Sequence, residues 1–245
     1  MALEDLGPFQ LATARVLLAA AIFAPAILRT RTEIGAREGL TLGFLGIVLY
    51  YATFNVGLAS ARATDAGVIQ ASIPAVSALL AIPILAERAN AWTWSGIGLS
   101  FAGVALLVRA TTGSGEGSLA GDLWIAASVL DWALYSVYVR RLSRRASGTA
   151  ITAAALGWGA LLLVPLGLAE LLWVRPSLTV PGAAAVVFLA VFAGALGYWL
   201  WSYGLARLRA GQATIYLNLL PLVAAASGVL VLGERLTGAE PVAAA

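Results

Sequence analysis

The 245-residue sequence contains no cysteine and no histidine, and all 15 of its basic residues are arginine. Without cysteine the chain forms no disulfide and has no thiolate for catalysis or metal binding. Without histidine it lacks the commonest metal ligand and the usual proton shuttle at neutral pH. It also has no GxxxxGK[ST] loop for a nucleotide. We therefore expect no metal, no cofactor and no catalytic residue, and we interpret the chain as a protein that is not an enzyme.

Charge is scarce along the whole chain. Only 11% of the residues are charged and 61% are hydrophobic, whereas a soluble domain has about 25% charged residues. Apolar runs of about 18 or more residues recur, which indicates membrane-spanning helices. The sequence thus predicts an all-α polytopic membrane protein with eight transmembrane helices. We place them at about 9–28, 39–59, 66–86, 92–109, 119–139, 149–170, 182–203 and 211–232.

The arginines lie mostly at the ends of these apolar runs and predict the orientation. One side of the membrane receives ten of them: Arg29, Arg31, Arg37, Arg88, Arg140, Arg141, Arg144, Arg145, Arg207 and Arg209. The other side receives four: Arg62, Arg109, Arg175 and Arg235. Because cytoplasmic loops carry the excess of positive charge, the first side should be cytoplasmic and both termini outside. This distribution favours a lipid bilayer over a nucleic acid as the partner of the basic residues, in a bacterial cytoplasmic membrane.

The chain contains an internal repeat. Residues Gly57–Arg88 match Gly204–Arg235 without a gap, with 12 identities in 32 positions at an offset of 147. The copies are centred on the third and eighth predicted spans, so they cross the membrane in opposite directions. Such inverted-topology repeats are typical of secondary transporters. We expect a first half at 1–112 and a second half at 119–245, joined by the glycine- and serine-rich Thr111–Ser118 in one membrane domain.

Both copies of the repeat end in Pro…Gly/Ala-Glu-Arg, and Gly121–Arg141 has aromatic and basic residues in a set pattern. In these motifs the sequence resembles the EamA-type permeases of the drug/metabolite transporter superfamily, whose fourth and ninth helices have similar endings. Gly121–Arg141, with its Trp-Ala-x-Tyr core and trailing Arg-Arg, resembles the sixth helix, and Arg15 matches an arginine of the second. The resemblance implies ten helices in two five-helix repeats and export or exchange of small metabolites such as amino acids.

The chain departs from the family pattern in its number of helices. It starts at what resembles the second helix and stops before a tenth, which would move both termini to the outside. Two interpretations stay open, a fragment of a longer protein and a reduced form.

Asp131 is the leading candidate for function. A carboxylate this deep in a membrane costs several kcal/mol if it is ionised and faces lipid, so we expect it to face a cavity. It belongs to a stripe with 4,3,4,3 spacing, which predicts one helix face. The members of this stripe are Trp124, Ser128, Asp131, Tyr135 and Tyr138. The stripe predicts either substrate contact with proton coupling at Asp131, or a structural carboxylate bonded to a neighbouring helix.

Further candidates lie on other spans. Arg15 is the single arginine inside a span. Three roles are open for it: binding an anionic group of a substrate, pairing with Asp131, or extending its side chain to the membrane surface. Tyr51 and Asn55 match Tyr198 and Ser202 at the repeat offset, with Trp201 beside them, and are candidates for the two cavity walls or for packing.

The repeat supplies prolines, amides and charged ends. Pro74 and Pro221 cannot donate a backbone hydrogen bond and predict kinks, beside the polar side chains of Gln70 and Asn218. The freed carbonyls either face a solute or merely accompany a hinge. The Glu-Arg pairs that end each copy, Glu87–Arg88 and Glu234–Arg235, are interpreted as interfacial anchors or as a gating salt bridge.

The leading function hypothesis is a secondary-active exporter or permease of small metabolites, such as amino acids or amphipathic solutes, by alternating access. The alternatives are a passive channel or scramblase-like pore and a transport-incompetent truncated paralogue. An intramembrane aspartyl protease would need two carboxylates in one site, and the sequence places only one acid at membrane depth.

Overall fold

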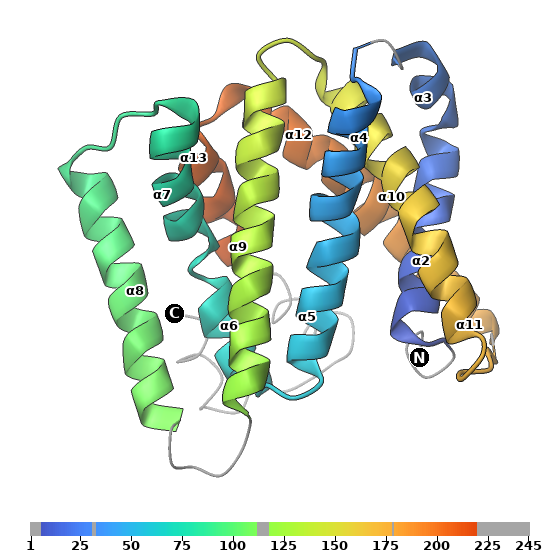
Figure 1. Cartoon of the computed structure of the whole chain (residues 1–245), viewed down its shortest axis with the longest axis horizontal. Helices are drawn as coiled ribbons and strands as arrows, with labels where there is room; N and C mark the ends of the chain where they lie inside the picture. Colours follow the sequence, from blue (N-terminus) through green and yellow to red (C-terminus); the bar gives the residue numbers. More distant parts are fainter. Residues whose placement is uncertain (1–5, 31–32, 112–117, 178, 220–245) are drawn as a thin grey trace.

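Every regular element in the described part of the chain is a helix (Figure 1). The structure is a computed structural model and describes residues 6–30, 33–111, 118–177 and 179–219. The elements up to the middle of the chain are α2 (Pro8–Ile22), α3 (Ala24–Thr30), α4 (Ala36–Gly43), η1 (Phe44–Leu49), α5 (Tyr50–Leu58), α6 (Ala63–Gln70), α7 (Ile73–Leu85) and α8 (Ala91–Thr111). The later ones are α9 (Leu119–Leu142), α10 (Gly148–Glu170), α11 (Val180–Phe188), η2 (Leu189–Leu196), α12 (Gly197–Arg207), α13 (Ala210–Ile215) and η3 (Tyr216–Leu219). The segments η1 and η2 are π-helical, and η3 is a 3-10 helix.

Hydroxyl caps set the start of three helices in the second half. Ser118, Ser147 and Thr179 each precede a helix, and each accepts a hydrogen bond from the backbone N–H three residues later, at 3.0, 3.2 and 3.1 Å. Such caps satisfy N–H groups that have no partner inside the helix. The starts of α9, α10 and α11 therefore follow from local sequence.

The helices coincide with the predicted spans. Within the described residues, four are long and apolar enough to cross a membrane: Ala36–Leu58, Asp65–Leu85, Gly148–Glu170 and Val180–Arg207. A fifth is added if the bent pair α2 and α3 forms one span. Helices α8 and α9 have 21 and 24 residues, enough for about 30 Å. The count of eight stays a prediction, because most of the last expected span lies outside the described residues.

The first expected span is bent, which the sequence analysis did not anticipate. Helices α2 and α3 meet at an angle of 62° around Phe23. Pro25 follows two residues later and has no N–H to donate to the carbonyl four residues back. The proline thus accounts for the break in an otherwise continuous apolar run.

The repeat is visible in the element boundaries. At the offset of 147, the end of η1 matches the end of η2, and the starts of α5 and α6 match those of α12 and α13. In Figure 1, α4 lies above α5, whereas α11 lies below α12. The segments that lead into the two copies therefore run in opposite directions through the molecule.

The two predicted halves interlock in the core. Helix α9 packs against α5, α6 and α7, and α10 packs against α2, α4 and α12. Close approach depends on glycine: a Cβ at Gly43 would collide with the backbone at Gly159, and one at Gly46 with the Tyr135 ring. Tyr135 is fully buried. Helix α9 consequently packs against helices of both predicted halves, α5, α6 and α7 in the first and α12 and α13 in the second.

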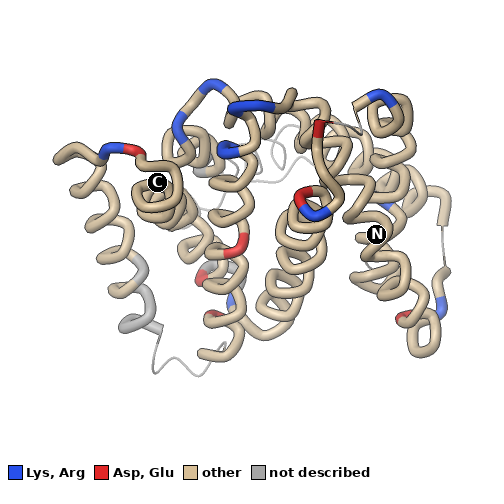
Figure 2. The backbone as a smooth tube through the Cα atoms, turned by 45° about the horizontal axis from the view of Figure 1, so that its top comes forward, with Lys and Arg blue, Asp and Glu red and all other residues tan. Residues whose placement is uncertain are grey.

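Arginines gather along one edge of the molecule, the upper edge in Figure 2. This edge holds the ends of α3, α7, α9 and α12 and the starts of α4 and α13 (Figure 1). We call it the arginine-rich rim, defined by Arg29, Arg37, Arg88, Arg140, Arg141, Arg144, Arg145, Arg207 and Arg209. Arg62 and Arg175 lie at the opposite ends of helices, before α6 and after α10.

Candidate functional site

A cluster of aromatic rings lies where α5, α9 and α12 meet, and Trp132 is at its centre. The Trp132 ring centroid is 4.8 Å from Tyr50, 5.3 Å from Tyr135, 5.7 Å from Trp201 and 6.0 Å from Tyr198. These separations are typical of favourable ring pairs. We call the set the aromatic cluster: Tyr50, Tyr51, Phe54, Trp132, Tyr135, Tyr198 and Trp201.

Several polar atoms in and beside the aromatic cluster are buried without a hydrogen-bond partner. Both carboxyl oxygens of Asp131 are among them, on a residue that is 3% exposed. The indole N–H groups of Trp132 and Trp201 and the hydroxyl of Tyr135 are likewise buried without a partner. Most buried polar groups in proteins are paired, so each exception asks for an explanation. Here acceptors and donors occur together, as expected where a polar solute binds.

Arg15 contacts the same cluster from α2. Its guanidinium carbon lies 4.5 Å from the centre of the Tyr51 ring, a cation–π arrangement. Its Nε is buried without a partner. The described residues contain no ion pair between Arg15 and Asp131, so the pairing considered from the sequence is not observed.

The polar groups of Tyr198 and its neighbours, in contrast, have hydrogen-bond partners. The Tyr198 hydroxyl donates to the carbonyl of Gly46, in η1, at 2.5 Å. The Thr152 hydroxyl lies 3.2 Å from the carbonyl of Tyr198 and 3.0 Å from the hydroxyl of Ser202. A π-helical segment leaves backbone carbonyls out of the regular ladder and is frequent at functional sites. The η1 segment thus provides the carbonyl that fixes Tyr198.

Comparison with known proteins identifies the family. The model of the EamA-like transporter family matches residues 1–109 and 119–245. The chain belongs to this family. It is an integral membrane protein and a membrane transporter of the drug/metabolite transporter type, and the family indicates a transporter rather than an enzyme.

Relatives of this EamA-like chain are also named as transporters or efflux pumps. It is 31% identical over 216 residues to the uncharacterized transporter YyaM of Bacillus subtilis, covering 86% of this chain and 70% of that protein. It is 24% identical over 249 residues to a probable amino-acid metabolite efflux pump of Escherichia coli, covering 97% and 82%. A solved crystal structure aligns with a TM-score of 0.70 at 21% identity, over 97% of this chain and 83% of the other, which shows a shared fold.

Within this EamA-like fold, the predicted stripe on α9 is only partly internal. Ser128, Asp131 and Tyr135 are buried, and Tyr138 is half-buried. Trp124 is 47% exposed and lies away from the cluster. The stripe therefore enters the core in its middle and leaves it at the end near the start of α9.

The other predicted residues fall into three groups. Tyr51, Tyr198 and Trp201 belong to the aromatic cluster. The Gln70 amide donates to Ser128 at 2.9 Å, one turn from Trp132 on α9. Asn55 is half-buried on α5 and its side chain makes no hydrogen bond within the described residues.

The two predicted kinks have different outcomes. Pro74 lies in the first turn of α7, two residues after the break that separates α6 from α7. Pro221 lies outside the described residues, and so does the second Glu-Arg pair. The side chain of Asn218 is likewise not described.

Sequence reasoning missed Trp132 and Tyr50, the residues with the densest ring contacts. Both are sequence neighbours of predicted residues, Asp131 and Tyr51. Trp132 also lies four residues after Ser128, a spacing that shares a helix face, but the 4,3,4,3 pattern chosen for the stripe passes over it.

No group of three or more acidic side chains that suits a metal ion occurs among the described residues.

Proposed function

We propose that this EamA-like transporter is a secondary-active exporter or permease of small metabolites such as amino acids or amphipathic solutes. The observation that carries the proposal is the group of buried polar atoms without partners around the aromatic cluster. Binding sites for small molecules combine apolar and aromatic walls with a few placed polar groups. A solute that supplies the missing partners gains hydrogen bonds that the empty protein forgoes.

The charges suit a zwitterion. The Arg15 guanidinium would bind a carboxylate, a pairing that its planar donors favour. The Asp131 carboxylate would accept hydrogen bonds from an ammonium group. The rings between them would receive an apolar or aromatic side chain, with a cation–π contribution from the ammonium. The name of the Escherichia coli relative is consistent with this substrate class.

The proposed mechanism is alternating access in a bacterial cytoplasmic membrane. The opposite directions of the two copies support it, because inverted repeats provide two related arrangements around one site. The arginine-rich rim would face the cytoplasm and both termini the outside. Asp131 would couple transport to protons, since an ionisable group at membrane depth is a common proton relay.

The test is transport by the purified protein in proteoliposomes. Vesicles are loaded in turn with radiolabelled amino acids, including aromatic ones, and counterflow is followed with and without a pH gradient. We expect counterflow and pH-driven accumulation of at least one amino acid. Equal leakage in both directions without accumulation would instead support a passive pore.

A matched pair of arginine variants sharpens this test. Arg15→Gln should slow transport by about tenfold or more, because a charge-assisted hydrogen bond contributes about 1.5–3 kcal/mol. Arg29→Gln removes an exposed arginine at the end of α3 and should leave transport unchanged. Equal transport by both variants would refute the role of Arg15 in binding.

A further inference from the structure

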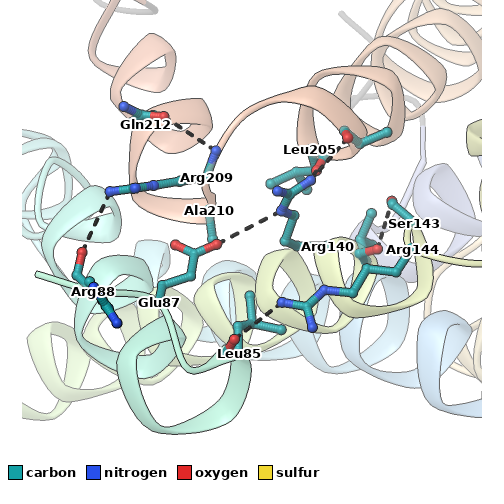
Figure 3. A network of polar contacts seen from close by, with 12 residues as sticks. Leu85, Glu87, Arg88, Arg140, Ser143, Arg144, Leu205, Arg209, Ala210 and Gln212 are labelled. Atoms are coloured by element: carbon teal, nitrogen blue, oxygen red, sulfur yellow. Dashed lines mark hydrogen bonds and ion pairs between the residues drawn. The ribbon is translucent and has the colours of Figure 1, made fainter.

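Arg140 links three helix ends at the arginine-rich rim (Figure 3). One terminal nitrogen of its guanidinium donates to the carbonyls of Leu205 and Ala206, in the last turn of α12, at 3.0 and 2.9 Å. Its Nε lies 3.8 Å from a carboxylate oxygen of Glu87, just after α7. Carbonyls in the last turn of a helix have no partner within it and attract cations. Arg140, on α9, therefore joins the end of α12 to the end of α7.

Two more arginines converge on the same end of α7. Arg144 donates to the carbonyl of Leu85 at 3.1 Å, and Arg209, just before α13, donates to the carbonyl of Arg88 at 3.5 Å. Figure 3 shows the side chains approaching the α7 end from two sides. All three arginines come from the second predicted half, and all their partners on α7 come from the first. The contacts thus tie the two halves together at the rim.

The backbone at this point is strained. Ala86, between Leu85 and Glu87, has a φ of 54° and lies in the left-handed region. Helices often end in this conformation, but usually on glycine, which has no Cβ to collide with the backbone. A strained alanine persists only where the surroundings hold it, and such positions are frequent in switch regions. Here the contacts of its two neighbours with Arg144 and Arg140 hold it.

Along α9 and α12, the network lies on the rim side of the aromatic cluster. On α9, Trp132, Ser136 and Arg140 follow one another at intervals of four residues, so Arg140 is about 12 Å beyond Trp132 along the helix axis. On α12, Leu205 follows Trp201 at the same interval. Ser136 and Leu205 are fully buried below the arginine. The residues between the cluster and Arg140 are consequently closed to solvent from this side.

The network also has space in which to open. A cavity of about 480 Å³ lies between α7, α8 and α13, and its lining includes Glu87, Arg88 and Arg209. The side chains of Arg140 and Glu87 are 22% and 16% exposed, so water reaches both. Water can therefore replace the lost contacts when the helix ends separate.

We propose that Arg140 is the gate residue of the arginine-rich rim: its contacts with Glu87 and with the end of α12 close the path to the aromatic cluster, and their release opens it. This inference rests on the proposed alternating access and goes beyond it, because it assigns the closing contact to a specific side chain. Glu87, interpreted from the sequence as part of an interfacial anchor or of a gating salt bridge, lies against Arg140.

The test uses the absence of cysteine. Ser136→Cys places a single thiol in the fully buried position below Arg140. With the arginine-rich rim on the cytoplasmic side, as proposed, inside-out membrane vesicles expose it to a membrane-impermeant maleimide. We expect Arg140→Gln to accelerate labelling of Cys at position 136 by about tenfold, the factor by which losing one charge-assisted hydrogen bond shifts an opening equilibrium. Glu87→Gln, a change of similar shape, should accelerate it by a smaller factor.

The matched control is Arg141→Gln, which removes the same charge from the adjacent position. The side chain of Arg141 makes no hydrogen bond or ion pair within the described residues, so labelling should stay at the rate of Ser136→Cys alone. Right-side-out vesicles test whether the opening is confined to this rim, and there the gate variants should show no acceleration. Elution of each variant as a single monodisperse peak in detergent excludes general unfolding as the cause.

The outcomes separate this proposal from the proposed function. Labelling needs no substrate, so faster labelling in Arg140→Gln and Glu87→Gln supports the gate even if no tested amino acid is transported. Unchanged labelling in both variants overturns the gate, whatever the transport assay gives. Acceleration by Arg141→Gln to the same extent overturns it as well, because the effect would then be one of net charge.

Discussion

The aromatic cluster and the arginine-rich rim treat polar groups in opposite ways. In the cluster, both oxygens of Asp131 and the indole N–H of Trp132 are buried without partners. At the rim, the guanidinium groups of Arg140, Arg144 and Arg209 each reach a helix-end carbonyl. The cluster therefore holds several unpaired buried groups, whereas the rim arginines use terminal nitrogens to join helices, although the Nε of Arg140 is itself buried without a hydrogen-bond partner.

From this difference we infer that the aromatic cluster serves binding and the arginine-rich rim serves closure. An unpaired buried polar group costs about 1–3 kcal/mol, and a charged one more. A protein with so few charged residues has little reason to place one there unless a solute or a proton takes up the capacity. Arginines that bridge helix ends instead stabilise one arrangement of those ends. Variants in the cluster should hence alter transport most strongly, and variants at the rim the equilibrium between open and closed states.

Asp131→Asn is the change with the largest expected effect on this comparison. The amide has nearly the same shape but cannot take up or release a proton, so pH-driven transport in proteoliposomes should fall by at least about tenfold. Counterflow without a pH gradient should be reduced much less, because the amide still accepts hydrogen bonds.

Asp122→Asn provides the control for this prediction, since Asp122 lies in the first turn of the same helix. It should retain pH-driven transport. Undiminished pH-driven transport by Asp131→Asn would remove the proton-coupling role. Arg144→Gln, which removes the bond to the Leu85 carbonyl, serves as a reference for a structural residue. If Asp131→Asn lowered thermal stability as strongly as this variant, Asp131 would be a structural group like those of the rim.

Much of the fold is predictable because it depends on local properties of the chain. Apolar length determines where a helix crosses a membrane, and the hydroxyl caps at Ser118 and Ser147 mark helix starts. The repeat makes the opposite directions of α5 and α12 predictable from helix counting alone. Asp131 can also be singled out from the sequence, because a lone acid within an apolar run is rare whatever its neighbours are.

The contacts between helices are not predictable in this way. Which side of α9 faces α5 and α12 depends on helix rotation and packing, and close approach at Gly46 and Gly43 contributes to both. Of the residues in the α9 stripe, Tyr135 is fully buried whereas Trp124 is 47% exposed, and the stripe passed over Trp132. The contact between Glu87 and Arg140 is not predictable either, because the two residues are distant in sequence.

Trp132→Ala tests whether the cluster depends on its central ring. Replacing the indole removes contacts with four other rings and leaves a cavity; the cost is about 3–5 kcal/mol at a fully buried tryptophan and less at Trp132, which is partly buried. We expect a clear loss of thermal stability in detergent, measured by the fraction of monodisperse protein after heating. Trp124→Ala, on the exposed end of the same helix, should have little effect. Similar losses in the two variants would contradict the central position of Trp132.

Gly46→Ala is the smallest change and tests how closely η1 approaches α9. An added methyl would overlap the ring of Tyr135, which is fully buried and cannot move aside freely. Overpacking of this kind costs about 1–3 kcal/mol, and a shift of the η1 backbone would also disturb the bond from Tyr198. Gly96→Ala is the matched control, since a Cβ at Gly96 on α8 meets nothing within 4 Å. There the change should be neutral or raise stability by up to about 1 kcal/mol through helix propensity. Equal melting behaviour in the two alanine variants would mean that η1 and α9 are farther apart than the cluster geometry requires.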